Sequence, residues 1–397
     1  MMRVLVLLLL FAILAACSTR QMIDVALSKD PRQAVRVLLE GRINSYKYNP
    51  ELAFSDIRKA QDEYNRLLGK LKKRSGEQWG KKEAEEVPTR TRYVKYTENF
   101  KNRTIVDFDQ GSVVIEHLEE DKAKARLRGA IVTAMLTPRD PRAVDLFSDK
   151  EIELNGTPYM QGLVADQNGK LVYTRREIEN YADFLVDNKM QTRSIDVDGK
   201  PKKVLYVQFN MVNNHIDKRA RQYAPLVNKY AEANRVSRSL VYAVIKTESS
   251  FNPYARSSVA YGLMQLVPKS GGRAAYGKVK GVDQEPSVDY LYDAENNIEL
   301  GSAYLSLLMN ETMLHEIDDP VSREYCAIAA YNTGPSNVMR AFSDNRNGKE
   351  RVIEAIEKIN SMRADEVYEA LRQSLPYEET RDYIAKVVGS KKLFALM

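Results

Sequence analysis

The hydrophobic pattern of the chain changes near residue 216, and this change limits the possible folds more than any other feature. Between residues 92 and 212, short apolar runs alternate with turn sequences rich in Gly and Asp. Such runs predict β-hairpins, and longer amphipathic stretches predict helices at 122–136 and 175–188. The expected hairpins are 104–108 with 112–118, 163–165 with 171–174, and 195–197 with 204–211. We therefore predict a mostly antiparallel sheet with helices on one face.

From residue 216 onward the strand signals stop. Apolar residues recur at helical spacing, and loops containing Gly, Pro and Ser separate the periodic stretches. The expected helices span 217–233, 239–248, 294–309, 323–331, 350–359, 364–375 and 379–393. The fold class is thus α+β, with an N-terminal α+β domain at 55–215 and an all-α domain at 216–397.

The first 16 residues have the features of a secretory signal. Arg3 precedes thirteen apolar residues, Val4–Ala16, a run shorter than the roughly twenty that a membrane-spanning helix needs. A buried core helix is the alternative. Leu14–Cys17 resembles the lipobox of bacterial lipoproteins. In those proteins the signal is cut before the cysteine, and the cysteine is then acylated.

The lipobox resemblance implies a signal peptide at 1–16 and a lipidated N-terminus and tether at 17–54. Acyl chains on Cys17 would hold the protein to a membrane, and more than one chain gives stable anchoring. The residue after Cys17 is Ser18 rather than Asp. By the same resemblance, this favours the periplasmic face of the bacterial outer membrane.

The stretch from residue 55 to 90 combines a helical pattern with a charged run. Apolar residues between Ile57 and Leu71 follow helical spacing, and the basic run Lys70–Arg74 opens a highly charged segment that reaches about Pro88. We interpret the charged segment as a solvated helix end and linker. A surface that touches anionic lipid or acidic cell-wall peptides is the alternative.

The composition excludes several functional classes. Lys and Arg number 60 against 54 Asp and Glu, a mildly basic balance of +6, and we do not expect nucleic acid as a partner. The chain has no phosphate-binding glycine motif, and His117, His215 and His315 are far apart. We therefore expect no metal and no cofactor. Cys326 has no pairing partner if Cys17 is acylated, and we expect it to be a small buried residue.

A glutamate ends the apolar face of the helix expected at 239–248. Leu240, Val244 and Glu248 are four residues apart, so they stack on one side of the helix. A carboxyl group at that position is partly desolvated, which raises its pKa toward the value that a general acid needs at neutral pH. The alternative is a helix-terminal Glu bonded to nearby backbone.

Five sequence blocks in order provide the context for this glutamate. The blocks are Thr247–Pro253, Gly262–Gln265, Asp293–Leu305, Ala330–Asn332 and Thr380–Tyr383. In order and spacing they resemble the lytic transglycosylases of glycoside hydrolase family 23, which are related to goose-type lysozyme. The resemblance implies a lysozyme-like catalytic domain at 216–397.

Three upstream blocks extend the resemblance to about residue 92. These blocks are Tyr93–Thr97, Asp145–Asp149 and Met211–Ile216. Together with the lipobox, they are similar to membrane-bound, lipid-anchored members of the same family.

The resemblance implies that the substrate is the glycan strand of peptidoglycan, cleaved at the β-1,4 bond between N-acetylmuramic acid and N-acetylglucosamine. Most glycosidases use two carboxylates, whereas here only Glu248 fits a catalytic motif. The implied reaction is substrate-assisted, with Glu248 as acid and then base, and it yields a 1,6-anhydro sugar without water. The residues that the resemblance places at the sugars are Ser257, Met264, Gln265, Tyr304, Tyr331, Asn332 and Tyr383.

Two loops depart from the family pattern. Between Ser257 and Gly262 the family commonly has one more residue and an extra glycine, which leaves the placement of Ser257 open. After Asn332 the chain reads Thr333–Ser336, where the family often has Ala first and a second Gly last. Pro335 stiffens this second loop.

Two other functions are compatible with the sequence. A hydrolase of the same bond would use water in place of the 6-hydroxyl, but no second carboxylate to place that water is identifiable. An inactive lipoprotein could tether the membrane to peptidoglycan, although Glu248, Gln265 and Tyr331 are all present. The sequence specifies no protein partner. It also does not distinguish cleavage at the ends of glycan strands from cleavage within them.

Overall fold

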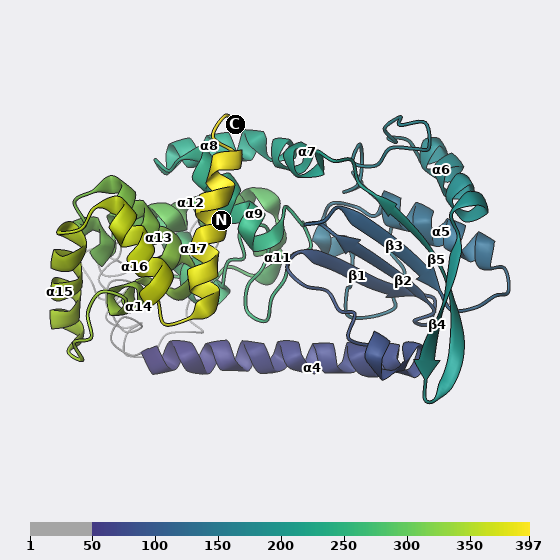
Figure 1. The fold of residues 1–397 in the computed structure, drawn as a ribbon, viewed down its shortest axis with the longest axis horizontal. Helices are drawn as coiled ribbons and strands as arrows, with labels where there is room; N and C mark the ends of the chain where they lie inside the picture. Colours follow the sequence, from purple (N-terminus) through teal and green to yellow (C-terminus); the bar gives the residue numbers. More distant parts are fainter. Residues whose placement is uncertain (1–49) are drawn as a thin grey trace, which may run out of the picture.

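The computed structural model describes residues 50–397, so the predicted signal peptide at 1–16 and Cys17 lie outside the described residues. Within this part, an antiparallel sheet with helices is followed by a helical domain, and the predicted fold class is confirmed (Figure 1). Among these residues, no helix is both long enough and apolar enough to cross a membrane.

The sheet of the described chain has the strand order β1-β2-β3-β5-β4, and each neighbouring pair is antiparallel. Two predicted hairpins are confirmed, one at β2 and β3 and one at β4 and β5. In the second, Asp198 and Gly199 both have positive φ, as a two-residue hairpin turn requires. The strands are β1 (Arg92–Thr97), β2 (Asn102–Asp107), β3 (Ser112–His117), β4 (Gln191–Val197) and β5 (Lys200–Asn210).

Both faces of the sheet are covered, so the prediction of helices on one face is wrong. Tyr93 and Val94 are neighbours in β1 and therefore point to opposite faces. Tyr93 belongs to the core formed with α5 (Ala123–Leu136) and α6 (Arg175–Asn188), the two helices predicted in this region. Val94 belongs to a second core on the opposite face.

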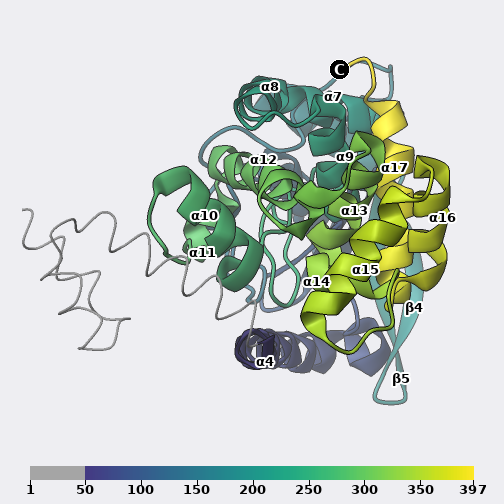
Figure 2. The ribbon, with the colours of Figure 1, turned by 90° about the vertical axis from the view of Figure 1, so that its left-hand side faces the viewer.

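The second face is covered by the C-terminal part of α4 (Pro50–Glu83), a helix that runs beneath both domains in Figure 1 and is seen nearly end-on in Figure 2. Leu71 and Trp79 of α4 are buried against the sheet. The charged segment after Leu71 is thus helical and packed, and the prediction of a solvated linker there is wrong. Glu83 accepts hydrogen bonds from Arg103 and Arg193 of the strands, which fixes the end of α4 to the sheet.

The third predicted hairpin, at 163–174, does not join the sheet. Its turn exists, because Asp166 N donates to Lys170 O, but the flanking residues form only isolated bridges such as Ala165 with Leu171. Val164 makes one isolated antiparallel bridge with Met211, directly after the end of β5, so the segment touches the sheet at a single position and does not extend it as a strand.

The helical domain follows the predicted helices closely. The stretch predicted as one helix at 217–233 divides at Tyr223, since Pro225 lacks the N–H that a continuous helix would use. The sequence pattern missed three short helices, α10, α11 and α14. The elements are α7 (His215–Gln222), α8 (Ala224–Ala233), α9 (Arg238–Ser249), α10 (Arg273–Lys280), α11 (Val288–Tyr292), α12 (Ala294–Asn310), α13 (Pro320–Thr333), α14 (Pro335–Arg340), α15 (Gly348–Asn360), α16 (Ala364–Ser374) and α17 (Glu378–Leu393), with the short helical turns η2 (Pro141–Ala143), η3 (Pro268–Gly272) and η4 (Met313–Glu316).

Helix α13 lies at the centre of this domain, where it contacts α12, α14, α16 and α17 (Figure 2). Cys326 on α13 is fully buried, as the sequence predicts for a small apolar residue. Burial raises the pKa of its thiol well above the usual range. A buried, protonated thiol is unreactive, so Cys326 has a packing role.

The two domains share a core at their junction. Tyr254, which follows α9, is buried in the core of the sheet domain, with its ring centroid 5.0 Å from that of Tyr93. Its hydroxyl donates to the carbonyl of Pro138. Nearby, Arg219 of α7 donates to the carbonyls of Phe108 and Ser250. The sheet domain thus packs directly against the segment that follows α9.

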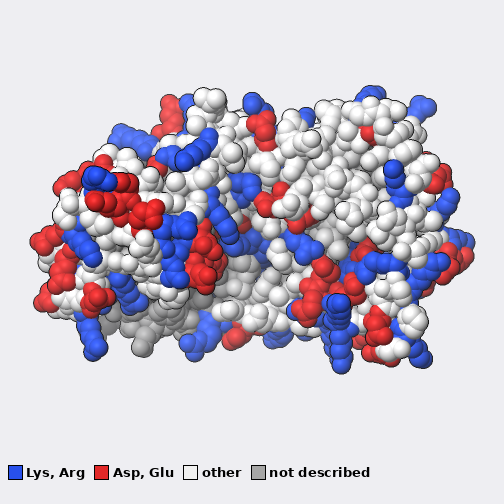
Figure 3. All heavy atoms as spheres, in the orientation of Figure 1, with Lys and Arg blue, Asp and Glu red and all other residues white. Residues whose placement is uncertain are grey.

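Basic and acidic side chains are interspersed on the face shown in Figure 3. This mixture agrees with the nearly balanced totals of 60 basic and 54 acidic residues. The face therefore presents no extended surface of a single charge.

Candidate active site

Glu248 lies in the last turn of α9, at the end of its apolar face. Ser237 caps the start of the helix, its hydroxyl accepting from Leu240 N, and Ser250 ends the helix in the left-handed conformation. Leu240 and Val244 are fully buried, and Glu248 itself is only 4% exposed. The structure therefore places the carboxyl group where the four-residue spacing predicts it.

Burial raises the pKa of Glu248 to about 7, although the charge of Arg90 and the hydroxyl of Tyr383 act in the opposite direction. Desolvation disfavours the charged carboxylate, and here it outweighs the nearby positive charge. A carboxyl group with a pKa near neutrality can donate a proton and take one back at the same pH.

An arginine from the other domain contacts this carboxyl group. Arg90 lies between α4 and β1, and its Nη1 donates to Glu248 Oε2 over 3.2 Å. Its Nη2 lies 3.6 Å from Glu379 Oε1 on α17. Sequence reasoning missed Arg90 because it belongs to no motif and lies 158 residues before Glu248. Only the docking of the two domains brings these residues together.

Two tyrosines complete the surroundings of Glu248. Tyr383 comes from α17 and Tyr331 from α13. Burial, followed by the charge of Glu248, raises the pKa of both phenols well above 10, so both remain protonated donors. The Tyr383 hydroxyl is buried and has no hydrogen-bond partner within ordinary geometry among the described residues.

The end of α13 connects to two other elements. The Tyr331 hydroxyl donates to Met264 O over 2.8 Å, and the ring of Tyr304 lies 5.3 Å from that of Tyr331. Asn332 Oδ1 accepts a 2.7 Å hydrogen bond from the Thr380 hydroxyl of α17. Tyr304, Tyr331 and Asn332 are partly exposed, so their side chains are accessible from solvent.

The loop before η3 holds two further predicted site residues. Gln265 has a φ of 48°, and its Nε2 donates to Gly262 O while its buried Oε1 has no partner among the described residues. Met264 is fully buried and packs against Gly301 of α12. Gly262 needs its hydrogen side chain, because a Cβ there would lie 2.3 Å from Asn297 Nδ2.

Ser257 stands apart from this group. Its hydroxyl accepts from Ala260 N, and its own N donates to Ala260 O, so it closes a local turn. Among the contacts of the described residues, none joins Ser257 to Glu248. The structure thus brings Tyr331 and Tyr383 to Glu248, links Met264, Tyr304 and Asn332 through neighbours, and leaves Ser257 in the adjoining loop.

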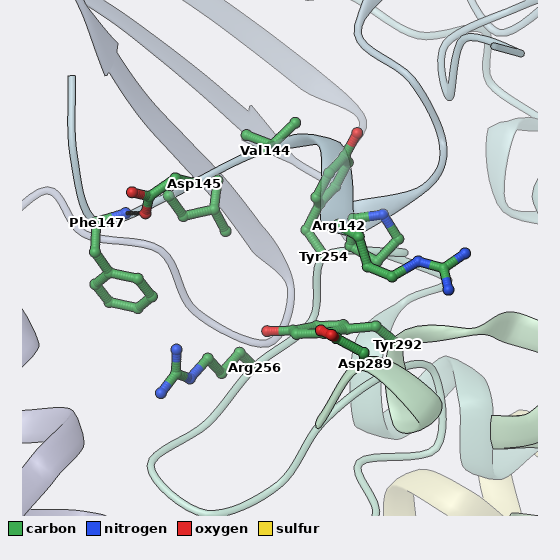
Figure 4. A pocket seen from close by; sticks show the side chains of 10 residues that line it. Arg142, Val144, Asp145, Phe147, Tyr254, Arg256, Asp289 and Tyr292 are labelled. Atoms are coloured by element: carbon green, nitrogen blue, oxygen red, sulfur yellow. Dashed lines mark hydrogen bonds between the residues drawn. The ribbon is translucent and has the colours of Figure 1, made fainter. Parts of the chain in front are cut away.

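A separate cavity of about 240 Å³ lies at the domain junction (Figure 4). Arg142 and Asp145 line it from the sheet domain, and Arg256, Asp289 and Tyr292 line it from the helical domain. It contains none of the predicted site residues. Within residues 50–397, no group of three or more His, Cys, Asp or Glu side chains is placed to hold a metal ion.

Comparison with known proteins places the chain in a family. A model described as "Membrane-bound lytic murein transglycosylase C, N-terminal domain" matches residues 57–222, and one described as "Transglycosylase SLT domain" matches 225–353. Membrane-bound lytic murein transglycosylase C of Yersinia pestis (strain Pestoides F) is 39% identical over 328 residues, which cover 82% of this chain and 88% of the relative. The chain belongs to the membrane-bound lytic murein transglycosylase C family.

The chain is also similar to a second curated relative and, in part, to a solved structure. The membrane-bound lytic murein transglycosylase C of Yersinia pseudotuberculosis serotype O:1b (strain IP 31758) has the same identity and coverage. Among solved structures, the 70 kDa soluble lytic transglycosylase of Escherichia coli is 24% identical, with a TM-score of 0.34. That match covers 46% of this chain and 26% of the soluble enzyme.

The residues of the candidate site are divided between the two family models that match this chain. The N-terminal model includes Arg90, and the transglycosylase model includes Glu248 and Tyr331. Glu379 and Tyr383, both on α17, lie beyond the end of the second match at residue 353. The domain match therefore ends before these two residues. The sequence block Thr380–Tyr383 predicted Tyr383, whereas Glu379 is identified by its contact with Arg90 in the structure.

Proposed function

We propose that this protein is a lytic transglycosylase that cleaves the β-1,4 bond between N-acetylmuramic acid and N-acetylglucosamine in peptidoglycan and leaves 1,6-anhydro ends. One observation carries the proposal: the Glu248 carboxyl group is only 4% exposed at the end of α9, burial raises its pKa to about 7, and the Arg90 guanidinium and the Tyr383 hydroxyl lie beside it. Family membership supports the class of reaction, a lyase acting on peptidoglycan.

In the first step, protonated Glu248 donates its proton to the bridging oxygen as the bond from C1 of the muramic acid breaks. The 2-acetamido oxygen of the same sugar bonds to C1 and carries the positive charge that develops there. No carboxylate nucleophile is needed, as in the substrate-assisted exceptions to the two-carboxylate rule. The N-acetylglucosamine leaves with a free 4-hydroxyl group.

In the second step, the Glu248 carboxylate removes the proton of the 6-hydroxyl group of the muramic acid. The 6-oxygen bonds to C1, the acetamido oxygen leaves C1, and the 1,6-anhydro ring closes. Glu248 is protonated again and no water is consumed. One group serves as acid and base because its pKa of about 7 lies near the working pH.

The remaining predicted residues have supporting roles in this proposal. The unpartnered Tyr383 hydroxyl and the Gln265 Oε1 are polar groups available to the substrate or to the reacting carboxyl. Tyr304 and Tyr331 offer partly exposed rings for sugar contacts, and Asn332 extends the same surface. Met264 acts through its carbonyl, which receives the Tyr331 hydroxyl. Ser257 is the least supported, since its hydroxyl is engaged in its own turn.

The N-terminal sequence supports a membrane anchor in the same proposal. We propose cleavage after residue 16, acylation of Cys17, a tether to residue 54, and sorting to the periplasmic face of the outer membrane. The catalytic unit would be residues 216–397, held on the domain at 55–215. Labelling with radioactive palmitate followed by membrane fractionation tests this part, and Cys17→Ala should abolish both the label and the membrane association.

The reaction is tested by mass spectrometry of the soluble products from purified peptidoglycan, with Glu248→Gln as the paired variant. Anhydro-muropeptides from the wild type and none from the variant are expected. Reducing ends would instead indicate a hydrolase that uses water. A folded wild-type protein without products would indicate an inactive tether. Exposed Glu378 on α17 supplies a control, Glu378→Gln, which should retain full activity.

A further inference from the structure

We propose that Arg90 of the sheet domain is a positioning residue for Glu248, and that Arg90 and Glu379 together adjust the proton affinity of the reacting carboxyl group. The sheet domain would then act in the reaction as well as in attachment. The inference rests on the proposed function in one respect, namely that Glu248 is the acid.

Hydrogen bonds hold the backbone at and around Arg90, and this orients its side chain toward the site. Asn252 is fully buried, and its Nδ2 donates to Arg90 O over 2.9 Å. Thr89 N donates to Arg92 O over 2.9 Å, and Arg92 N donates back to the Thr89 hydroxyl over 3.2 Å. The turn that carries Arg90 is therefore held by the sheet domain and by the segment following α9.

The guanidinium group lies between two carboxyl groups of different exposure. Its Nη1 lies 3.2 Å from Glu248 Oε2, whose side chain is 6% exposed, and its Nη2 lies 3.6 Å from Glu379 Oε1, whose side chain is 72% exposed. The contact to Glu248 is sheltered from solvent and holds one carboxyl oxygen in place. The contact to Glu379 is open to solvent, so it constrains the guanidinium less.

Four groups from three elements face the Glu248 carboxyl: Arg90 before β1, Tyr331 on α13, and Glu379 and Tyr383 on α17. The charge of Arg90 and the Tyr383 hydroxyl lower the pKa of Glu248, while Glu379 raises it. Tyr331 remains neutral because its own pKa is raised well above 10. Arg90 and Glu379 are therefore the two charged groups with opposite effects on the carboxyl.

This arrangement suits a carboxyl group that changes charge during the reaction. When Glu248 is protonated in the first step, Glu379 still balances the charge of Arg90. When Glu248 is ionised before the second step, Arg90 stabilises the carboxylate directly. Without Arg90, burial alone would hold the proton more tightly, which favours the acid step and disfavours ionisation.

The consequence is a shift in the pH dependence of kcat/KM, whose alkaline limb reports deprotonation of the acid in the free enzyme. Arg90→Met removes a lowering influence, so the limb should move to higher pH by about one unit. Glu379→Gln removes a raising influence, so the limb should move to lower pH, and by less because Glu379 is exposed. Arg90→Lys retains the charge and should restore most of the wild-type profile.

The experiment compares these variants in the full-length protein in detergent, with anhydro-muropeptide release measured from pH 5 to 9. Matched controls are Arg92→Met, whose partner is Glu86, and Glu378→Gln on α17. Both controls should leave the limb in place. Opposite shifts for Arg90→Met and Glu379→Gln support the proposal. Unmoved limbs in both variants, together with an unmoved titration of Glu248 in folded protein, would overturn it.

A second measurement separates this inference from the proposed function. The carboxyl groups are titrated by NMR in protein labelled with ¹³C-glutamate, and Glu248→Gln identifies the Glu248 signal. If Arg90→Met moves that titration but leaves the pH–rate profile unchanged, Arg90 tunes Glu248 but Glu248 is not the acid of the reaction. If the titration stays in place, the proposed role of Arg90 fails, whatever the products are.

Discussion

The Tyr331 hydroxyl donates a 2.8 Å hydrogen bond to the backbone carbonyl of Met264, and so joins the end of α13 to the loop that carries Gln265. The bond connects two sequence blocks that are 67 residues apart. Because the loop residue Gln265 has a φ of 48°, its backbone is in a conformation that non-glycine residues rarely adopt. The Tyr331 bond adds one of the contacts that hold this conformation.

We therefore expect Tyr331→Phe to lose activity through the position of Gln265. The lost hydrogen bond should cost about 1 kcal/mol of unfolding free energy. Misplacement of the loop should lower kcat/KM by between about ten- and a hundred-fold. Product release from peptidoglycan and urea unfolding measure the two effects. Tyr325→Phe is the control on the same helix, since the Tyr325 ring packs at a tilt against Tyr368 and no hydrogen bond of its hydroxyl is seen in residues 50–397.

Gly301 of α12 should be required for the packing of Met264. A Cβ at this position would lie 2.2 Å from Met264 Sδ and 3.0 Å from its Cβ, so the buried side chain would have to move. Overpacking of this kind typically costs about 1–3 kcal/mol. Thermal unfolding of Gly301→Ala measures it, and activity should fall in parallel because Met264 adjoins Gln265.

Gly129 supplies the opposite case for the same substitution. It is exposed within α5, and a Cβ there meets nothing within 4 Å. Gly129→Ala should therefore stabilise the protein by up to about 1 kcal/mol through helix propensity. Equal effects of the two substitutions would contradict the packing argument for Gly301.

The elements predicted best are those whose boundaries are set locally. The stretch 175–188 forms α6 as predicted, because Thr174 and Glu177 make a capping box at its start. The turn at Asp198 and Gly199 was also recognisable from the two residues alone. By contrast, the sequence analysis did not predict β1. No turn sequence precedes this strand, and it is stabilised by its pairing with β2.

The errors arise where tertiary contacts decide the outcome. The charged run after Leu71 has the composition of a solvated segment, but it is buried along one side by the sheet and ion-paired at Glu83. In the site, motifs located Glu248, Tyr331 and Tyr383, since short spacings and helix faces carry that information. Arg90 could not be located in this way, because its contact with Glu248 depends on how two separately patterned domains dock.

Tyr254 should contribute more to the stability of the whole protein than its position in a loop suggests. Its ring packs against Tyr93 and Tyr159 in the core of the sheet domain. Tyr254→Ala should cost about 3–5 kcal/mol, as for other large buried aromatic residues. Tyr254→Phe keeps the ring and loses only the hydrogen bond to Pro138 O, so it should cost about 0.5–1.5 kcal/mol.

Urea unfolding of both Tyr254 variants, monitored by circular dichroism, tests this prediction. Because Tyr254 joins the two domains, we also expect Tyr254→Ala to separate their unfolding transitions, whereas Tyr254→Phe should keep one transition. If Tyr254→Ala unfolds at the wild-type urea concentration, the shared core does not couple the domains.

The raised pKa of Glu248 should make the folded protein less stable above neutral pH than below it. The pKa is about 7 in the folded state, against about 4.3 for an unperturbed Glu in the unfolded chain. Between these values the folded protein holds a proton that the unfolded chain has released. The contribution of this proton to stability is therefore complete below about pH 4.3 and is lost as the pH rises through 7.

Replacing Glu248 with Gln should remove this dependence, because the amide does not titrate. The free energy of unfolding of Glu248→Gln, relative to wild type, should increase by about 2–3 kcal/mol between about pH 5 and pH 8. Urea unfolding at the two pH values measures the change, and exposed Glu378→Gln provides a control that should show none. A difference between wild type and Glu248→Gln that is constant with pH would mean that Glu248 is already ionised at pH 5, and a carboxylate in that state could not donate the proton that begins the cleavage.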